Sequence, residues 1–282
     1  MKYSNIISII GLTNVGKSYI YNKILGKYKS YIHKKNNFTI NLIYNTIYIN
    51  KIKNLIIDTP GYNNNNYNKF SYYLRTKILD IIDDSNIIIY ITKNNRYIKD
   101  NIFLKKIRNK INNKKSILIF LNKKKEKINL IYLKYFKLQN IIIINKSIKI
   151  NKLIINKLAK IINNDKKYNY YFYEDNKYYI IDSIRNLIYT EYYKEIPYSI
   201  FIYNINIIKY KFLYKIIIYI VIEKESQRKI LIGYNMNKIN VIKKKIRKLI
   251  DIKYKIKNIR LEFNIKILRW KNNNLFLKKN YI

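Results

Sequence analysis

The first part of the chain alternates short apolar runs with stretches whose apolar residues recur at helical spacing. Runs of four to eight apolar, often β-branched residues are typical of buried strands, and apolar positions three or four apart are typical of a helix packed on one face. The expected strands are 5–10, 45–49, 54–58, 86–92, 116–122 and 141–145. The expected helices are 18–26, 77–83 and 152–162, with another after residue 122. This alternation predicts an α/β fold, a mostly parallel sheet with helices on both faces.

A different order of elements begins after a polar break at residues 163–175. The elements expected there are a helix at 182–193, strands at 200–210 and 215–225, a basic helical region around Gly233, and a strand at 259–267. A chain of 282 residues can form two hydrophobic cores. We therefore expect two domains, residues 1–168 and 169–282. The asparagine run at 63–66 is expected to be a loop.

Basic residues far outnumber acidic ones, with 58 Lys and Arg against 16 Asp and Glu and a formal net charge of +42. Only eight of the basic residues are Arg, and the chain has five Gly and two Pro against 32 Tyr. This preference for residues with AT-rich codons indicates an AT-rich genome, so part of the charge reflects drift toward Lys. The charge still predicts strong attraction to polyanions, with nucleic acid as the leading partner.

The chain contains no Cys, which excludes disulfides. It contains one His, His33, so we do not expect a dedicated transition-metal site. We expect His33 to lie in a loop. The apolar runs, such as 216–222, are far too short to cross a bilayer, and no secretory segment is evident. We therefore expect a soluble, cytoplasmic protein.

Residues 11–18 read GLTNVGKS and match the phosphate-binding loop G-x-x-x-x-G-K-[ST]. In such a loop Gly11 and Gly16 let backbone N–H groups wrap a phosphate, Lys17 reaches the β and γ phosphates, and Ser18 places its hydroxyl on Mg²⁺. The loop lies between an expected strand and an expected helix, whose N-terminus favours anions. Gly26 then suits the end of that helix.

A second candidate motif, DTPG, follows the expected strand at 54–58. Asp58 is expected to bind Mg²⁺ through water, and the Gly61 N–H to face the γ phosphate. The alternative is an ordinary turn at the end of a strand, which D-T-P-G also forms well. Thr39, in a polar stretch between the two motifs, is expected to close over Mg²⁺ and the γ phosphate.

In this order the motifs resemble the Era family of ribosome-assembly GTPases: GLTNVGKS, a loop Thr, DTPG, and Asn122-Lys123 after an apolar strand. The second half is similar as well. It reads FYEDNKYYIIDSIRNLIYTEYYKEIPYSIFI, then IEKESQRKILIG, then LEFNIKILRW, in the order and spacing of the C-terminal KH domain of that family. The resemblance therefore covers nearly the whole chain.

The resemblance implies a P-loop G domain followed by a small α+β type II KH domain. It implies that the ligands are GTP and GDP with Mg²⁺, held by Ser18, Thr39 and Asp58, and that Asn14 helps to hold K⁺. Lys17, Thr39 and Gly61 are the residues expected to act in catalysis. Tyr62 stands where Ras-like enzymes carry a water-orienting glutamine, so hydrolysis is expected to be slow. The full set of candidate nucleotide contacts is Gly11, Asn14, Val15, Gly16, Lys17, Ser18, Tyr19, Asp58, Thr59, Pro60, Gly61, Asn122, Lys123, Lys125, Glu126, Asn145 and Lys146.

The guanine-reading motif N-K-x-D departs from the family pattern, because Lys125 occupies the Asp position. That Asp accepts hydrogen bonds from guanine N1–H and N2–H, whereas an ammonium group only donates. Glu126 could supply the carboxylate if the loop is shifted by one residue; alternatively, base reading has decayed. The second base-contacting motif of such GTPases is usually Ser-Ala-x, and Asn145-Lys146 is a weak match to it.

KH domains clamp the nucleic-acid backbone with a G-x-x-G loop between two helices. Here Gly233 is present, but Met236 replaces the second glycine. The next segment combines an apolar stripe, from Ile239 to Ile250, with crowded lysines. The candidate RNA contacts are Gly233, Tyr234, Asn235, Lys238, Lys244 and Arg247.

The leading hypothesis is a monomeric, slowly hydrolysing GTPase that binds the 3′ end of 16S ribosomal RNA and assists assembly of the small ribosomal subunit. The rival is a non-hydrolysing or base-unspecific RNA-binding protein with a degenerate G domain. We leave open weak peripheral association with a membrane, although no clear amphipathic anchor is evident.

Overall fold

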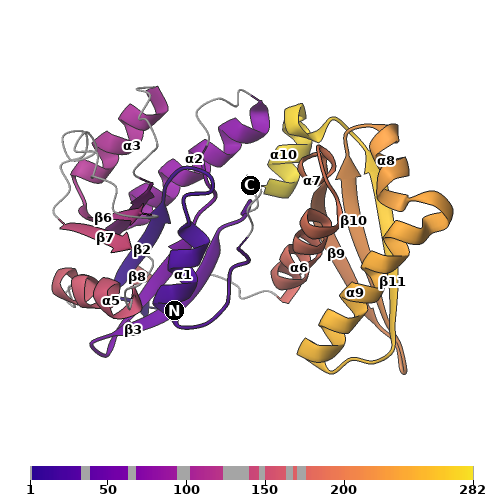
Figure 1. Cartoon of the computed structure of the whole chain (residues 1–282), viewed down its shortest axis with the longest axis horizontal. Coiled ribbons are helices and arrows are strands. Elements are labelled where there is room, and N and C mark those ends of the chain that lie inside the picture. The colour runs from indigo at the N-terminus through magenta and orange to yellow at the C-terminus, as the bar shows by residue number, and fades with distance from the viewer. Residues whose placement is uncertain are drawn as a thin grey trace. The chain divides into compact units, whose positions relative to one another are not determined.

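The computed structural model describes residues 2–32, 39–62, 68–93, 102–122, 140–145, 150–162, 168–169 and 176–281. The chain forms two compact units (Figure 1). The first comprises Met1–Tyr67 and Ser71–Tyr173, and the second comprises Asn68–Phe70 and Glu174–Ile282. The boundary that we propose from the sequence falls in the short strand β8 (Tyr168–Asn169), which pairs with β1 (Lys2–Tyr3) in the first unit.

The first unit is built on a six-stranded sheet in the order β3-β4-β2-β5-β6-β7. The strands are β2 (Asn5–Ile10), β3 (Ile43–Ile49), β4 (Ile52–Asp58), β5 (Ile87–Thr92), β6 (Lys115–Asn122) and β7 (Asn140–Asn145). Only β3 is antiparallel to its neighbour; the other pairs are parallel. The mostly parallel sheet expected from the sequence is thus confirmed.

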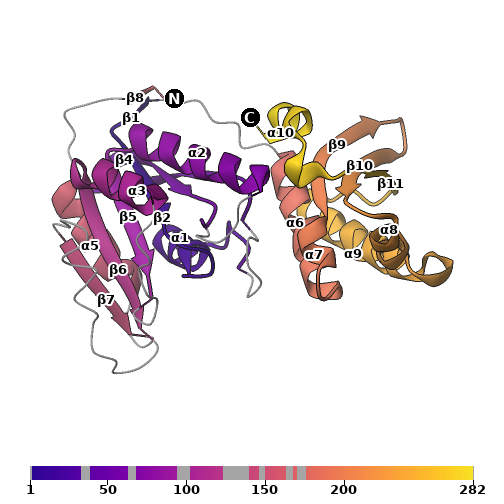
Figure 2. The same ribbon diagram turned by 90° about the horizontal axis from the view of Figure 1, so that it is seen from above.

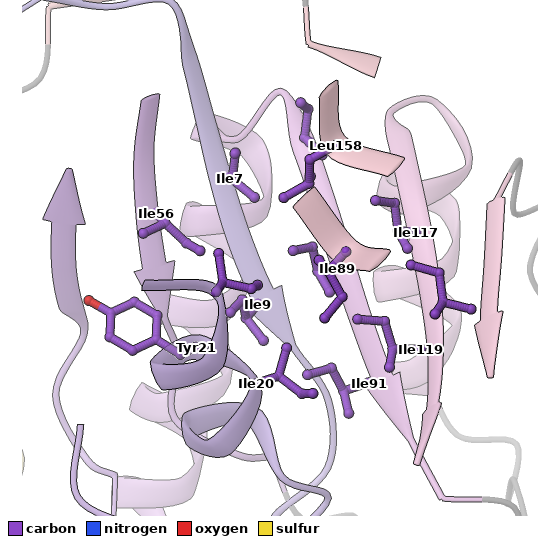
Figure 3. Packing of buried hydrophobic residues seen from close by; sticks show 14 of the residues in the cluster. Ile7, Ile9, Ile20, Tyr21, Ile56, Ile89, Ile91, Ile117, Ile119 and Leu158 are labelled. Atoms are coloured by element: carbon purple, nitrogen blue, oxygen red, sulfur yellow. The ribbon is translucent and has the colours of Figure 1, made fainter. Parts of the chain in front are cut away.

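Helices cover both faces of this sheet, because the strands alternate their side chains between two cores. Ile87, Ile89 and Ile91 of β5 pack with α1 (Lys17–Leu25) and α5 (Ile150–Ile161), the core drawn in Figure 3. Ile88 and Tyr90 face the other way and pack with α2 (Lys69–Asp84) and α3 (Ile102–Asn112). The helix expected after residue 122 lies outside the described residues.

Both nucleotide motifs lie at the same edge of the sheet, at the carboxyl ends of adjacent parallel strands. The loop at 11–16 follows β2, and DTPG begins at the last residue of β4. Ile9 is paired in register with Asp58, which aligns the two strand ends. Open α/β sheets bind their ligands at this edge.

The second unit has a three-stranded sheet in the order β11-β10-β9. Its elements are α6 (Asn176–Glu191), α7 (Ile196–Ser199), β9 (Phe201–Lys209), β10 (Tyr214–Ile222), α8 (Glu225–Ile232), the 3₁₀ turn η1 (Tyr234–Met236), α9 (Asn237–Tyr254), β11 (Ile259–Ile267), the 3₁₀ turn η2 (Trp270–Asn272) and α10 (Asn274–Tyr281). Strand β10 is antiparallel to β9 and parallel to β11. Helices α6 and α9 pack on one face of the sheet and α10 on the other (Figure 2).

Aromatic packing closes the α10 side of this unit. Trp270 is fully buried, its ring stacks on Phe201 with centroids 5.0 Å apart, and its indole N–H donates to the Ser199 carbonyl at 2.8 Å. A buried Trp with its N–H satisfied combines a large apolar contact with no unpaired donor. Trp270 therefore fixes the C-terminal segment, including α10, against the start of β9.

Helix α9 is amphipathic, with Ile242, Ile246 and Ile250 buried while Lys244 and Arg247 are exposed. The apolar stripe expected from the sequence is the face that packs on the sheet. None of the helices within the described ranges combines the length and apolar character that a membrane span requires.

Candidate functional site

The loop between β2 and α1 is closely packed around its two glycines. Gly16 caps α1 with φ 106°, a backbone conformation that favours glycine, and its carbonyl accepts from Ile20 N–H at 3.0 Å. A Cβ at Gly16 would lie 2.6 Å from Leu121 Cδ1, and one at Gly11 would lie 2.3 Å from the Ile91 carbonyl oxygen. The loop can therefore form only with glycine at these two positions.

Lys17, the first residue of α1, points its side chain back into the loop. Its ammonium donates to the carbonyls of Leu12 at 2.8 Å and Gly11 at 3.2 Å, and the side chain is buried. The positive charge of Lys17 is thus held inside the loop, at the N-terminus of a helix, where backbone N–H groups also attract anions.

Three oxygen-bearing side chains from separate segments meet beside Lys17. The Ser18 hydroxyl donates to Asp58 Oδ2 at 2.7 Å and lies 3.2 Å from the Thr39 hydroxyl. Asp58 is fully buried at the end of β4. The three residues expected to hold Mg²⁺ are therefore brought together, although 40 positions separate Ser18 from Asp58.

The sequence did not identify Ser30, which holds the Asp58 carboxylate by a hydrogen bond. The Ser30 hydroxyl donates to Asp58 Oδ2 at 2.9 Å, and Ser30 itself is held by Asn22 of α1. The Asn22 amide donates to the Ser30 carbonyl at 2.6 Å, and its oxygen accepts from Ser30 N–H at 2.9 Å. No sequence signal identifies Ser30, since a serine in a polar loop is ordinary.

A shallow pocket opens over these groups. Its lining includes the predicted residues Asn14, Gly16, Lys17, Ser18, Tyr19, Thr39 and Gly61, and three that were not predicted, Thr13, Tyr31 and Ile32. Thr13 could have been included because it lies within the loop motif. Tyr31 and Ile32 carried no such signal.

Other predicted contacts have structural roles for their side chains. Val15 is part of the hydrophobic core, and the buried Thr59 hydroxyl donates to the Ile9 carbonyl at 2.7 Å. Pro60 is buried as well. Any contact that Val15 or Thr59 makes with a nucleotide would therefore come from the backbone.

Gly61, which ends the DTPG motif, lines the pocket, whereas the next residue, Tyr62, does not. A Cβ at Gly61 would lie 2.6 Å from Thr13 Cα and 2.9 Å from Lys17 Nζ. The Tyr62 ring turns into the core, where its hydroxyl lies 2.6 Å from that of Tyr90 and its centroid 5.3 Å from that of Phe103. In this arrangement the Tyr62 hydroxyl does not face the pocket.

The predicted base-reading residues are only partly within the described residues. The backbones of Asn122 and Asn145 end β6 and β7 and are paired in register, so the two motifs start side by side. Lys123, Lys125, Glu126 and Lys146, like His33, lie outside the described residues.

The loop between α8 and α9 has positive φ at three residues, of which only Met236 disfavours this conformation. Gly233 has φ 75°, whereas Asn235 and Met236 have φ 46° and 60°. Tyr234 and Met236 are exposed, and Lys238 lies over the Tyr192 ring at 5.8 Å. Lys244 and Arg247 are exposed further along α9. The predicted RNA contacts therefore occupy this loop and the exposed face of α9.

We expect Met236→Gly to stabilise the protein by roughly 1 kcal/mol, because a left-handed residue with a Cβ costs about 1–2 kcal/mol and glycine loses part of that gain through unfolded-state entropy. Chemical denaturation of the full chain measures the change. Met236→Ala is the matched control, since it shortens the side chain but keeps the Cβ. Equal stability of the Gly and Ala variants would contradict the expectation.

Comparisons with known proteins agree with this arrangement. The family described as 50S ribosome-binding GTPase matches residues 6–123. The chain is 27% identical to GTPase Era of Ureaplasma parvum serovar 3 over 298 residues, covering 99% of this chain and 97% of that protein. It spans less of other relatives: 58% of GTPase Era of Buchnera aphidicola at 32% identity, and 28% of GTPase Der of Karelsulcia muelleri at 34% identity.

The fold similarity extends over both units. A crystal structure of Era in complex with MgGDPNP and nucleotides 1506–1542 of 16S ribosomal RNA superposes with a TM-score of 0.80 at 20% identity, covering 98% of each chain. The expected G domain followed by a KH domain is thereby confirmed as the fold. Together with the family match over the nucleotide motifs and the full-length alignment with an Era protein, this fold similarity shows that the chain is similar to the Era family of GTPases over nearly its whole length.

Proposed function

We propose that this protein binds GTP with Mg²⁺, hydrolyses it slowly, and binds the 3′ end of 16S ribosomal RNA during assembly of the small ribosomal subunit. The convergence of Lys17, Ser18 and Thr39 on one pocket, with the Asp58 carboxylate hydrogen-bonded to Ser18, is the observation that carries the enzymatic part. The relative solved with GDPNP and a 16S RNA fragment supports the choice of ligand and partner.

The pocket residues fit a nucleotide phosphate with Mg²⁺. The glycines allow the backbone to approach a phosphate, and Lys17 supplies a buried positive charge. Mg²⁺ is usually held by one or two carboxylates together with phosphates and water. The pocket supplies two hydroxyls, those of Ser18 and Thr39, and the buried Asp58 carboxylate lies within hydrogen-bond distance of Ser18. In the part of the chain that the structure describes, no group of three or more His, Cys, Asp or Glu side chains could hold a metal by itself.

Each residue then has a distinct role in our proposal. Lys17 would move its ammonium from the loop carbonyls to the β and γ phosphates, and the Gly61 N–H would face the γ phosphate. Ser18, Thr39 and Asp58 would hold Mg²⁺, which neutralises charge on the phosphate oxygens when bound. Because the Tyr62 hydroxyl lies against Tyr90, no side chain at this position orients the attacking water, and hydrolysis is slow without help.

Asn14 is the residue that we propose for a K⁺ ion beside the phosphates. The Lys93 ammonium donates to the Asn14 backbone carbonyl, so K⁺ would have to compete with this ammonium for that oxygen. We further propose that the protein is cytoplasmic and monomeric, with at most weak peripheral association with membranes.

RNA binding in the proposal belongs to the second unit. The loop at 233–236 keeps left-handed backbone, and exposed cationic side chains follow it on α9. Lysine and arginine contacts to phosphate give affinity, whereas an exposed ring such as that of Tyr234 can stack on an unpaired base. We propose Gly233, Tyr234, Asn235, Lys238, Lys244 and Arg247 as the contacts.

Base specificity tests the proposal most directly. If Glu126 has replaced the missing Asp, we expect Glu126→Ala to weaken GTP binding by roughly 1–3 kcal/mol while barely altering ATP binding, since only guanine presents the paired N1–H and N2–H donors. Affinities of the full chain for GTP, GDP, ATP and XTP measure this effect.

Lys125→Asp is the matched variant for the alternative. If base reading has decayed, Glu126→Ala is silent and Lys125→Asp creates a preference for GTP over ATP. If both variants keep the wild-type affinities for GTP and ATP, a side-chain carboxylate does not read the base at either position. Equal affinity of the wild type for all four nucleotides would favour the degenerate RNA-binding protein over the GTPase.

A further inference from the structure

The turn between β9 and β10, which we call the hairpin tip (Lys209–Tyr214), carries two exposed aromatic rings between lysines. Phe212 is 81% exposed and Tyr210 is 52% exposed. Lys209 and Lys211 are exposed beside them. A single large apolar side chain at this level of exposure is common, but several side by side indicate an interaction site.

The tip is held in a defined conformation. Tyr210 N–H donates to the Leu213 carbonyl at 2.8 Å, which closes the turn. The connection after α9 braces it: the Asn258 side chain donates to the Phe212 carbonyl at 3.1 Å, and Tyr214 N–H donates to the Asn258 carbonyl at 2.9 Å. The Phe212 ring is therefore presented to solvent on an ordered backbone, which lowers the entropic cost of a contact.

The connection that contacts the tip is cationic. Lys255 and Lys257 are exposed in this connection, which reaches the tip at Asn258. Within the described part of the chain, the ammonium groups of Lys209, Lys211, Lys255 and Lys257 form no ion pair with a carboxylate. Asp251 is the exposed acid nearest in sequence to this group.

We infer that the hairpin tip is a second contact for single-stranded RNA, with the Phe212 ring stacking on a base and the neighbouring lysines contacting phosphates. Single-strand binding combines a cationic surface with aromatic rings on which bases stack, whatever the base sequence. Exposed rings between lysines that have no carboxylate partner among the described residues provide both parts, and Lys209 also lies over the Tyr214 ring at 5.8 Å. The inference shares with the proposed function the premise that this unit binds RNA.

The tip lies at the far end of β10 from the start of α8 (Figure 1). Nine residues of extended strand separate the two ends, which corresponds to about 25–30 Å. A KH loop clamps four nucleotides, so a short RNA that fills it leaves the tip unoccupied, whereas a longer strand can reach both. Because the second contact is then intramolecular, it raises the affinity for long RNA selectively.

The test compares the full chain with Phe212→Ala for binding of single-stranded RNAs of about 5 and about 25 nucleotides. We expect Phe212→Ala to weaken binding of the long RNA roughly tenfold, within the range for loss of one stacked base, and to leave the short RNA unaffected. Tyr193→Ala is the matched control, because Tyr193 is also exposed, at 74%, in the same unit but away from the turn. Thermal unfolding of each variant verifies that the fold is kept.

Two conservative variants identify what the tip contacts. Phe212→Trp should retain binding of the long RNA, and Phe212→Leu should not, since stacking requires a ring. Equal loss for Phe212→Ala and Tyr193→Ala, or full binding by Phe212→Leu, would overturn the inference. If Phe212→Ala instead abolishes cosedimentation with anionic vesicles without affecting RNA, the tip binds a lipid surface and the inference is wrong.

The same measurements separate this inference from the proposed function. If the wild type binds both RNAs and Phe212→Ala changes neither affinity, only the second contact is disproved. If the wild type binds neither RNA, the RNA-binding part of the proposed function fails, and the inference fails with it.

Discussion

Lys17→Ala is expected to abolish GTP hydrolysis and to weaken nucleotide binding at least about 100-fold, equivalent to roughly 2.7 kcal/mol. The Lys17 ammonium is buried within the loop and donates to two backbone carbonyls there. In the proposed complex it exchanges these carbonyls for phosphate oxygens, and charge-assisted hydrogen bonds of this kind are among the strongest that a protein makes. Titration with a fluorescent GDP analogue and single-turnover hydrolysis measure the two effects.

Lys27→Ala provides the control for this prediction. Lys27 is exposed just beyond the C-terminal end of α1, so its removal changes the net charge equally without touching the pocket. If Lys17→Ala and Lys27→Ala retain the same turnover and affinity, the loop does not bind phosphate through Lys17 and the enzymatic proposal fails. The low solvent exposure of Lys17 requires that the fold of each variant be checked by circular dichroism.

The architecture of the first unit was predictable because its residues obey simple periodic rules. Ile87, Ile89 and Ile91 face one helix layer while Ile88 and Tyr90 face the other, which is the double burial that a continuous apolar run indicates. The second unit was harder to derive in detail. The parallel pairing of β11 with β10 and the closing role of Trp270 depend on contacts between distant residues, which local periodicity does not encode.

The candidate site also contains some residues that the sequence could identify and some that it could not. Lys17, Ser18 and Asp58 could be identified because each belongs to a motif with a recognised mechanical role. Ser30 could not, because its importance comes from the chain path that brings its hydroxyl 2.9 Å from Asp58 Oδ2. In the loop at 233–236 the sequence was partly misleading. Met236 in place of the second glycine suggested that the clamp is altered, whereas the backbone at Met236 is left-handed although the residue is not glycine.

Gly61→Ala is expected to reduce GTP turnover at least about 100-fold by a purely steric route. An added Cβ would lie 2.6 Å from Thr13 Cα and 2.9 Å from Lys17 Nζ, distances that require the backbone or the Lys17 side chain to move. Displacing groups around a reacting phosphate by about 1 Å can cost 10²-fold in rate. GTP analogue binding should weaken more than GDP binding, because in the proposed complex the Gly61 N–H faces the γ phosphate that GDP lacks.

Gly26→Ala separates this effect from the general cost of replacing a glycine. Gly26 ends α1 with φ 66°, so alanine is strained there, but a Cβ at this position would lie no closer than 4.0 Å to Asn151 Nδ2. We therefore expect Gly26→Ala to lower stability by about 1 kcal/mol while keeping turnover near that of the wild type. Gly61→Ala should show the opposite pattern, with a large loss of turnover that is out of proportion to any loss of stability. Turnover by Gly61→Ala within about threefold of the wild type would mean that the pocket can absorb the extra methyl group, and that the approach of the backbone to the γ phosphate at this position does not limit the reaction.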